Sequence, residues 1–303
     1  MTRAIQHGVF GAPPADLADV PPGAVQFSPL VPGAARLEDR RGDLLSLTML
    51  APPGTAERRH ALALGLKALV PGGLLVALAP IRKGGARLPA ELAAFGLDVA
   101  SVPARHHRVC KAVAAGRLDG VEAAIAEGAP RIVPELGLWS QPGVFAFDRI
   151  DRATALLIDA MPVPAGRGAD LGCGIGLIAR AVLLSPSVSA LTLVDIDRRA
   201  IECAEHNVVD PRATFLWADV RSAVLPDGLD FVVMNPPFHD GATEDRALGQ
   251  TFIRRAAACL GKGGRAYVTA NRHLPYENVL KASFRVVRSL DAGEGYKLFE
   301  AIR

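Results

Sequence analysis

The sequence predicts an α/β protein of two tandem domains. Three observations support this fold class: apolar runs of strand length alternate with helical segments, glycine and proline separate them, and one ordered set of these signals occurs twice. A chain of 303 residues, half of them apolar, is long enough for one large or two ordinary domains. The repeat favours two.

The repeat begins with an apolar strand and a double proline. Residues 43–57 (DLLSLTMLAPPGTAE) and residues 230–244 (DFVVMNPPFHDGATE) each contain an acidic residue, an apolar run and two consecutive prolines. Each copy then predicts a helix, a Gly-Gly turn, a strand, a second helix and a final strand. The matching downstream segments are residues 69–80 with 260–271, and residues 88–102 with 274–287.

The two copies differ in what precedes them. A glycine-rich turn precedes the second copy, whereas a shorter, proline-rich segment without such a turn precedes the first. Ala51 also stands where Asn235 stands in the second copy. We therefore expect residues 1–130 to form a degenerate domain without chemistry and residues 131–303 to form the working domain. The Pro/Gly-rich stretch 127–143 contains the expected boundary.

Composition narrows the function classes. The four cysteines are scattered without C-x-x-C spacing, which argues against a metal site and for a reduced, cytoplasmic setting. No apolar stretch of signal-peptide type begins the chain, and Lys67 and Pro71 interrupt the most apolar region, residues 61–81, so we expect no membrane association. A formal charge of +3 is compatible with an RNA partner but does not require one.

A glycine-rich turn lies between a predicted strand and helix in residues 166–183 (GRGADLGCGIGLIARAVL). Glycines at 172, 174 and 176 allow positive φ and close approach of a ligand to the backbone. A dinucleotide fingerprint requires G-x-G-x-x-G, but position 177 is leucine. The turn, formed by Gly172, Gly174 and Gly176, therefore disfavours a pyrophosphate ligand.

Aspartates follow three consecutive predicted strands, whose carboxyl ends meet at the ligand-binding edge of an open α/β sheet. Asp170 could hold a cationic amino group, Asp195 two ribose hydroxyls, and Asp219 an adenine amino group. The neighbouring Ile196 and Val220 belong to the same expected site. Each aspartate alone could instead be a helix cap or a turn residue. Together they favour a nucleoside that carries an amino acid.

The stretch MNPPFHDG follows the next predicted strand. Pro236 and Pro237 each lack a backbone N–H and fix φ, and a residue before proline is held in extended geometry, so the loop is rigid and Asn235 is held in a narrow range of directions. Taken alone, the loop could equally be a surface turn.

Together, DLGCGIG, LVDID, WAD and MNPPFHDG resemble class I S-adenosylmethionine-dependent methyltransferases of the small-domain group with an N-P-P-[FY] motif. The resemblance is closest to the guanine-N2 methyltransferases of 16S and 23S ribosomal RNA and covers residues 136–303. It implies two tandem Rossmann-like domains, the first degenerate and the second a seven-stranded S-adenosylmethionine-binding sheet. It also implies ribosomal RNA or a ribosomal subunit as the partner. The first half is shorter than is usual in this family, particularly in its first forty residues.

The expected chemistry centres on an exocyclic amine of a base. Asn235 and the Pro236 carbonyl would accept its two N–H groups, Pro237 would stiffen the loop, and Phe238 would stack on the base. Phe145, with Asp151, would cover the cofactor. For His239 we favour a plain loop contact over proton uptake.

Basic residues of the first half suggest an RNA-docking surface, although ordinary solvated surface is the commoner explanation for such residues. The basic residues are Arg40, Arg41, Arg58, Arg59, Arg82, Lys83, Arg87, Arg105, Arg108 and Lys111.

Two other substrates remain open, adenine N6 and the N5 amide of a protein glutamine. A catalytically inactive RNA-binding or ribosome assembly factor is the alternative outside the enzymes.

Overall fold

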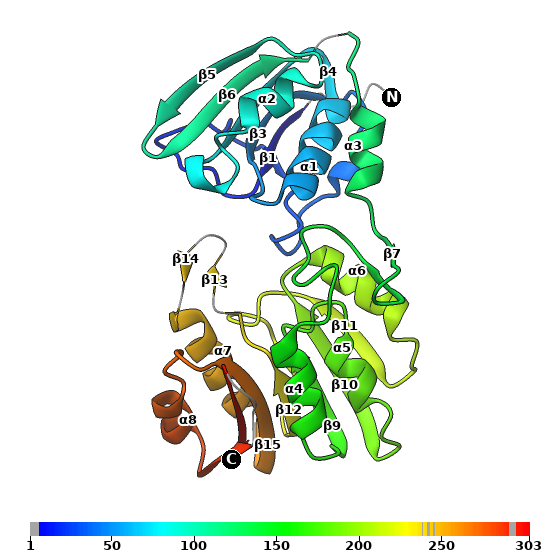
Figure 1. Ribbon diagram of the computed structural model, residues 1–303, viewed down its shortest axis with the longest axis vertical. Coiled ribbons are helices and arrows are strands. Elements are labelled where there is room, and N and C mark those ends of the chain that lie inside the picture. Colours follow the sequence, from blue (N-terminus) through cyan, green and yellow to red (C-terminus); the bar gives the residue numbers. More distant parts are fainter. Residues whose placement is uncertain (1–5, 115, 238, 241–242, 245, 291–294) are drawn as a thin grey trace. The chain divides into compact units, whose positions relative to one another are not determined.

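The chain forms two compact units, shown as ribbons in Figure 1. The computed structural model describes residues 6–114, 116–237, 239–240, 243–244, 246–290 and 295–303. One unit comprises Met1–Pro130 and Gln141–Gly143, and the other Arg131–Ser140 and Val144–Arg303. Within the described ranges, no helix has both the length and the apolar character needed to cross a membrane.

The first unit is a six-stranded sheet with strand order β2-β1-β3-β4-β6-β5, in which β1 to β4 are parallel and β6 is antiparallel to β4 and β5. Its elements in chain order are β1 (Gln6–Phe10), β2 (Val25–Gln26), η1 (Leu37–Asp39), β3 (Leu44–Leu50), α1 (Thr55–Ala68), β4 (Leu69–Pro80), η2 (Ile81–Lys83), α2 (Leu88–Ala93), β5 (Val99–Ala104), β6 (His107–Val113) and α3 (Val121–Glu127).

The second unit is a seven-stranded sheet with strand order β11-β10-β9-β12-β15-β17-β16, preceded by a small β7-β8 hairpin. The expected seven-stranded α/β sheet is therefore confirmed. Its elements are β7 (Arg131–Val133), β8 (Leu138–Ser140), α4 (Arg152–Ala160), β9 (Gly166–Leu171), α5 (Leu177–Val182), β10 (Val188–Asp195), α6 (Arg198–Asn207), β11 (Ala213–Trp217), β12 (Leu229–Met234), β13 (His239–Asp240), β14 (Thr243–Glu244), α7 (Arg246–Cys259), β15 (Leu260–Asn271), α8 (Glu277–Ser283), β16 (Val286–Leu290) and β17 (Tyr296–Ile302).

The two sheets share one design. The run β1-β3-β4-β6-β5 of the first matches β9-β12-β15-β17-β16 of the second in order and direction. Strands β4 and β15 are both twelve residues long and have the same sequence of buried and exposed positions. The segments that the sequence repeat pairs are therefore equivalent strands.

The Gly-Gly pairs form bulges, not the turns that the sequence suggested. They lie inside β4 and β15, where pairing with the neighbouring strand shifts register. Gly72 and Gly263 have φ of 82° and 80°. A Cβ on Gly73 or Gly264 would lie 2.9 or 2.7 Å from a backbone carbonyl oxygen, so only glycine fits the close approach. Each copy also ends in two antiparallel strands where one was expected.

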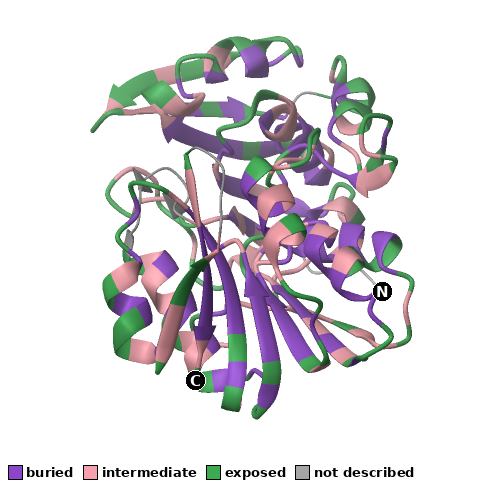
Figure 2. Ribbon diagram, turned by 60° about the horizontal axis from the view of Figure 1, so that its bottom comes forward, coloured by how far each residue is buried: buried purple, intermediate pink, exposed green. Residues whose placement is uncertain are grey.

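Both faces of the second sheet are buried along most strands, as Figure 2 shows. One face packs on α7 and α8 through residues such as Met234, Ile253 and Leu280. The other packs on α4, α5 and α6 through residues such as Leu157, Val233 and Leu298. Parallel strands buried on both faces leave their carboxyl ends as the natural place for ligands.

Candidate active site

The carboxyl ends of β9, β10, β11 and β12 lie along one edge of the second sheet, because these strands are parallel neighbours. Asp170 lies within β9, Asp195 is the last residue of β10, and Asn235 directly follows β12. Asp219 comes two residues after the end of β11. The residues that the sequence singled out therefore share this edge.

The three glycines of the turn after β9 all have positive φ, at 78°, 53° and 87°. Their surroundings differ. A Cβ on Gly174 would meet nothing within 4 Å, whereas a Cβ on Gly176 would lie 2.8 Å from Val208 Cγ2. Gly174 thus leaves open space beside the backbone, and Gly176 permits close packing at the start of α5.

Asp170 is completely buried, and neither carboxylate oxygen has a hydrogen-bond partner of ordinary geometry among the described residues. Burial raises the pKa of Asp170 to about 8, the Asp195 carboxylate adds to the rise, and the backbone N–H of Ala179 opposes it weakly. A buried carboxylate without a partner is costly, and a cation beside it would remove that cost. Asp170 therefore fits an ammonium group.

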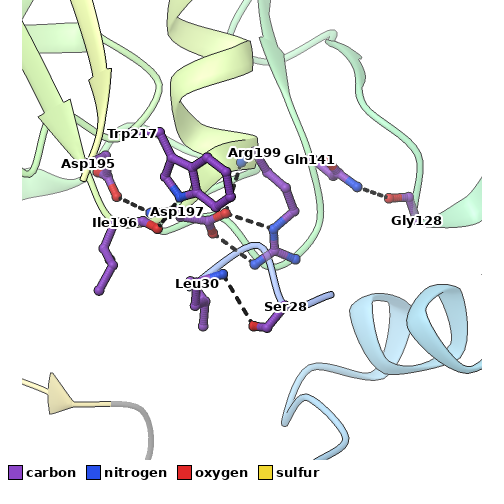
Figure 3. A network of polar contacts seen from close by, with 9 residues as sticks. All are labelled: Ser28, Leu30, Gly128, Gln141, Asp195, Ile196, Asp197, Arg199 and Trp217. Carbon is purple, nitrogen blue, oxygen red and sulfur yellow. Dashed lines mark hydrogen bonds and ion pairs between the residues drawn. The ribbon is translucent and has the colours of Figure 1, made fainter. Parts of the chain in front are cut away.

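Asp195 is tied to the backbone on both oxygens. The N–H of Gly174 donates to one at 2.8 Å, and the N–H of Asp197 to the other at 2.9 Å. Burial raises the pKa of Asp195 to about 6, and these hydrogen bonds oppose the rise. Each oxygen keeps a lone pair for a hydroxyl donor. Figure 3 shows Asp195 with its neighbours Ile196, Asp197, Arg199 and Trp217.

Three other expected cofactor residues are engaged within the unit. Ile196 accepts a hydrogen bond from Trp217 Nε1 at 2.8 Å through its carbonyl. Asp219 binds Arg221, whose Nε lies 2.8 Å from Oδ2; burial raises the pKa of Asp219, but the hydrogen bonds from Arg221 outweigh this and lower it. Val220 is buried, and its carbonyl accepts from Arg255 Nε at 2.9 Å. The backbone around Asp219 is thus fixed from both sides.

The Asn235 amide is held by α4. Its Nδ2 donates to Asp151 Oδ2 and to Thr154 Oγ1, both at 3.0 Å. These bonds use both amide hydrogens, so Oδ1 is the only polar atom left for another group. Asp151 is also the N-cap of α4 and accepts from the Thr154 N–H at 2.9 Å. The sequence suggested Asp151 only as a cover over the cofactor and did not indicate Thr154, although the D-x-x-T spacing at a helix start was a usable signal.

A hollow connects this amide to the glycine turn. It brings Asn235 together with Phe145, Gly172 and Gly174, and Phe145 is 59% exposed at its rim. Asp195, Ile196, Asp219 and Val220 lie at the same sheet edge but do not line it. The full lining is Phe145, Ala146, Asp151, Thr154, Gly172, Cys173, Gly174, Ile175, Leu177, Ile178 and Asn235.

The double-proline loop begins directly after β12, with Pro236 buried and Pro237 half-buried. Phe238, the expected stacking residue, lies outside the described residues. Among the described histidines, cysteines and acids, no group of three or more could hold a metal ion, and the four cysteines are free and buried.

The corresponding positions of the first unit are apolar. Strand register equates Val9 with Asp170, and Leu50 with Asn235. The expected match of Ala51 to Asn235 is therefore wrong by one residue. That match aligned the prolines of the two segments, whereas the strand pairing places Leu50 at the position of Asn235.

The double-proline loop of the first unit is also occupied from within. Arg58 on α1 is completely buried, and its Nη1 donates to the carbonyls of Pro52 and Pro53 at 3.1 and 2.7 Å. Its Nε and Nη2 each lie 2.6 Å from a carboxylate oxygen of Glu91. Arg58 is therefore unavailable to RNA, and its place among the docking residues was wrong.

Comparison with known proteins adds independent findings. A model of the methyltransferase small domain family matches residues 135–300. The ribosomal RNA small subunit methyltransferase C of Pseudomonas aeruginosa (strain LESB58) is 31% identical over 292 residues, which cover 92% of this chain and 86% of that protein. Its namesake from Pseudomonas paraeruginosa (strain DSM 24068 / PA7) is 31% identical over 287 residues, with the same coverage.

Among solved structures, the T. thermophilus 16S rRNA N2 G1207 methyltransferase in complex with AdoMet and guanosine is similar over most of the chain. The alignment has a TM-score of 0.74 and 25% identity, and it covers 89% of this chain and 76% of that one. The similarity extends over both units.

Proposed function

The chain belongs to the methyltransferase small domain family, among relatives of the ribosomal RNA small subunit methyltransferases C, and we propose that it methylates N2 of a guanine in ribosomal RNA with S-adenosylmethionine as the donor. The Asn235 amide carries this proposal. Its two hydrogens are held by Asp151 and Thr154, which leaves its oxygen to accept from an amine beside the glycine turn. We place the reaction in the cytoplasm, on RNA or on a ribosomal subunit.

The residues present fit the cofactor. Asp170 would neutralise its ammonium group, and Asp195 would accept from its ribose hydroxyls. The open side of Gly174 allows a close approach to the backbone, with Gly172 and Gly176 shaping the turn. The remaining members of the proposed site are Ile196, Asp219 and Val220 near the adenine and Phe145 over the entrance. The sulfonium methyl, when the cofactor is bound, is the electrophile of the reaction.

The chain's own part in catalysis is positioning. Asn235 Oδ1 and the Pro236 carbonyl each accept one N–H of the exocyclic amine, which turns the nitrogen lone pair out of conjugation with the ring. With the cofactor bound, the amine so positioned would form the new N–C bond to its methyl group as the C–S bond breaks, and would lose one proton to water. We propose Phe238 as the stacking residue that holds the unpaired base, a contact worth about 1–3 kcal/mol.

We further propose that the first unit docks RNA at the carboxyl edge of its sheet. Arg82 on η2 and Arg87 are exposed, and Lys83 beside them is half-exposed. Arg105 is exposed as well but forms an ion pair with Asp16. Cations at this edge would contact phosphates irrespective of sequence.

The test is transfer of labelled methyl from S-adenosylmethionine to bulk ribosomal RNA, followed by mass spectrometry of the nucleosides. N2-methylguanosine is the expected product. Asn235→Ala should reduce kcat by at least about a hundredfold, since loss of a group that positions the reacting amine costs on the order of 3 kcal/mol. A rate within twofold of the wild type would contradict the role of Asn235.

The rival functions give different products. N6-methyladenosine would indicate an adenine enzyme, and label in a protein glutamine would indicate the amide substrate. Calorimetry without any S-adenosylmethionine binding would indicate an RNA-binding or assembly factor that has kept the fold.

A further inference from the structure

Thr269 lies next to Asn235 across two paired strands. Met234 of β12 pairs with Val268 of β15, so the following residues, Asn235 and Thr269, are neighbours. Side chains alternate along a strand, and Val233 and Tyr267, two residues earlier on each strand, both belong to the apolar cluster on the α4 side. Thr269 therefore points to the same face of the sheet as Asn235, the face that α4 covers.

The Thr269 hydroxyl is completely buried and makes no hydrogen bond within the part of the chain that the structure describes. A buried hydroxyl without a partner costs free energy that an isosteric valine would not. Valine also suits a strand interior at least as well. Packing alone therefore gives no reason for threonine at this position.

The first unit provides an internal comparison. Strand register equates Leu50 and Leu78, a directly paired couple, with Asn235 and Thr269. Both leucines pack in one small apolar cluster. The same place in the fold thus carries two apolar residues in the unit whose loop is filled by Arg58, and two polar residues in the unit with the open hollow.

We propose that Thr269 is a positioning residue for Asn235, an inference that rests on the proposed function. Both hydrogens of the Asn235 amide are already donated, so Oδ1 is the atom that a neighbouring O–H can reach. A change of rotamer brings the Thr269 hydroxyl to Oδ1 in the free enzyme, and this hydrogen bond shortens when the base is bound. One lone pair of Oδ1 is then fixed, and the other accepts the amine.

Two substitutions separate positioning from packing. Thr269→Val keeps the shape and removes the hydroxyl, and Thr269→Ser keeps the hydroxyl. We expect Thr269→Val to lower kcat by about tenfold, the equivalent of one ordinary hydrogen bond, with KM for S-adenosylmethionine within twofold. Its melting temperature should equal or exceed that of the wild type. Thr269→Ser should restore most of kcat.

A buried threonine of the first unit is the matched control. Thr48 is 2% exposed, and its hydroxyl donates to the Asp19 carbonyl at 3.2 Å. Thr48→Val should lower the melting temperature and leave kcat unchanged. If Thr269→Val keeps kcat within twofold of the wild type while the wild type is active, the positioning role is wrong.

A second readout does not depend on turnover. The side-chain amide signals of Asn235 in a ¹⁵N–¹H spectrum can be assigned by their loss in Asn235→Ala. Thr269→Val should shift and broaden these signals because the amide samples more than one rotamer, and Thr269→Ser should not. Unchanged signals in Thr269→Val would overturn the proposal. A wild type that methylates no RNA would overturn the proposed function instead, and this spectrum would still test Thr269.

Discussion

Two residues at the sheet edge, Asp170 and Asn235, differ in how far the protein itself satisfies their polar atoms. Asp170 is buried, and its carboxylate has no hydrogen-bond partner of ordinary geometry among the residues that the structure describes, whereas both hydrogens of the Asn235 amide are donated. The first arrangement stores a cost that a cation relieves, and the second leaves one acceptor atom with a fixed direction. Both follow from strand ends, which is why the sequence could predict these residues. The D-x-x-T spacing could have indicated Thr154 at the start of α4, whereas Thr269 follows from the pairing of β12 with β15, which no spacing along the chain shows.

The raised pKa of Asp170, about 8, predicts a pH-dependent affinity for S-adenosylmethionine. The ligand-free carboxyl is largely protonated at pH 7, while binding an ammonium requires the ionised form. Affinity relative to Asp170→Asn should therefore rise from pH 6 to 8, by at most about tenfold per unit, and level off above pH 8.

Calorimetry of both proteins at pH 6, 7 and 8 measures that ratio. The asparagine variant corrects for the ligand's own amino group, which titrates near pH 8. Below pH 6 the Asp195 carboxyl, with its pKa of about 6, should add a second fall in affinity that both proteins share. A ratio that stays constant from pH 6 to 8 would show that Asp170 does not meet the ammonium.

Asp151 combines a helix cap with support of the Asn235 amide, and a serine can separate the two. Serine also caps helices, so Asp151→Ser should change the free energy of unfolding by less than about 0.5 kcal/mol. Its shorter side chain gives up the contact to Asn235, so kcat should fall by about tenfold or more. Denaturant unfolding and single-turnover methyl transfer measure the two effects. Asp151→Ala, which loses both, is the comparison, and a serine variant with wild-type kcat would refute the support role.

At the level of elements, the prolines and glycines between the predicted strands and helices revealed the repeat, but they did not reveal the hairpin that ends each copy. Paired prolines and glycines mark equivalent strands in both units. The turn between β5 and β6 uses Arg105 and His106 at φ of 42° and 64°, residue types that signal no turn. The carbonyl of His106 accepts from the Ile81 N–H as the carbonyl of Gly295 accepts from the Arg272 N–H, so the two hairpins are equivalent despite their sequences.

The Arg58–Glu91 pair joins α1 to α2 in the first unit and should be costly to break. Glu91→Leu alone leaves a buried guanidinium without its partner and should lower the free energy of unfolding by about 3–5 kcal/mol. Arg58→Met with Glu91→Leu should recover most of that loss. Chemical denaturation measures both. Glu122→Gln, at an exposed pair with Lys67, is the control and should cost less than about 1 kcal/mol. If Glu91→Leu alone were as stable as the double variant, the Arg58–Glu91 pair would not be costly to break.

At the scale of the whole molecule, the first unit has kept the sheet and lost the site. Strand β2 is the outermost strand on that side, so no strand in the described part of this unit corresponds to β11. A proline-rich segment stands between β1 and β2 where α5 stands in the second unit. Val9 and Leu50 replace Asp170 and Asn235. This unit carries positive charge at its carboxyl edge. The sequence identifies the basic residues, but it does not show that they lie at this edge.

Positive charge at the carboxyl edge of the first sheet should attract RNA. Arg82→Gln with Lys83→Gln should raise KM for RNA about tenfold or more, leave kcat at saturating RNA within twofold, and reduce the slope of log affinity against log salt by nearly two. The control is Arg117→Gln with Lys67→Gln, which removes two charges near the amino edge of the same sheet. Methyl-transfer kinetics and filter binding at several salt concentrations give the three quantities. Equal effects of the two double variants would mean that net charge, and not this edge, attracts the RNA.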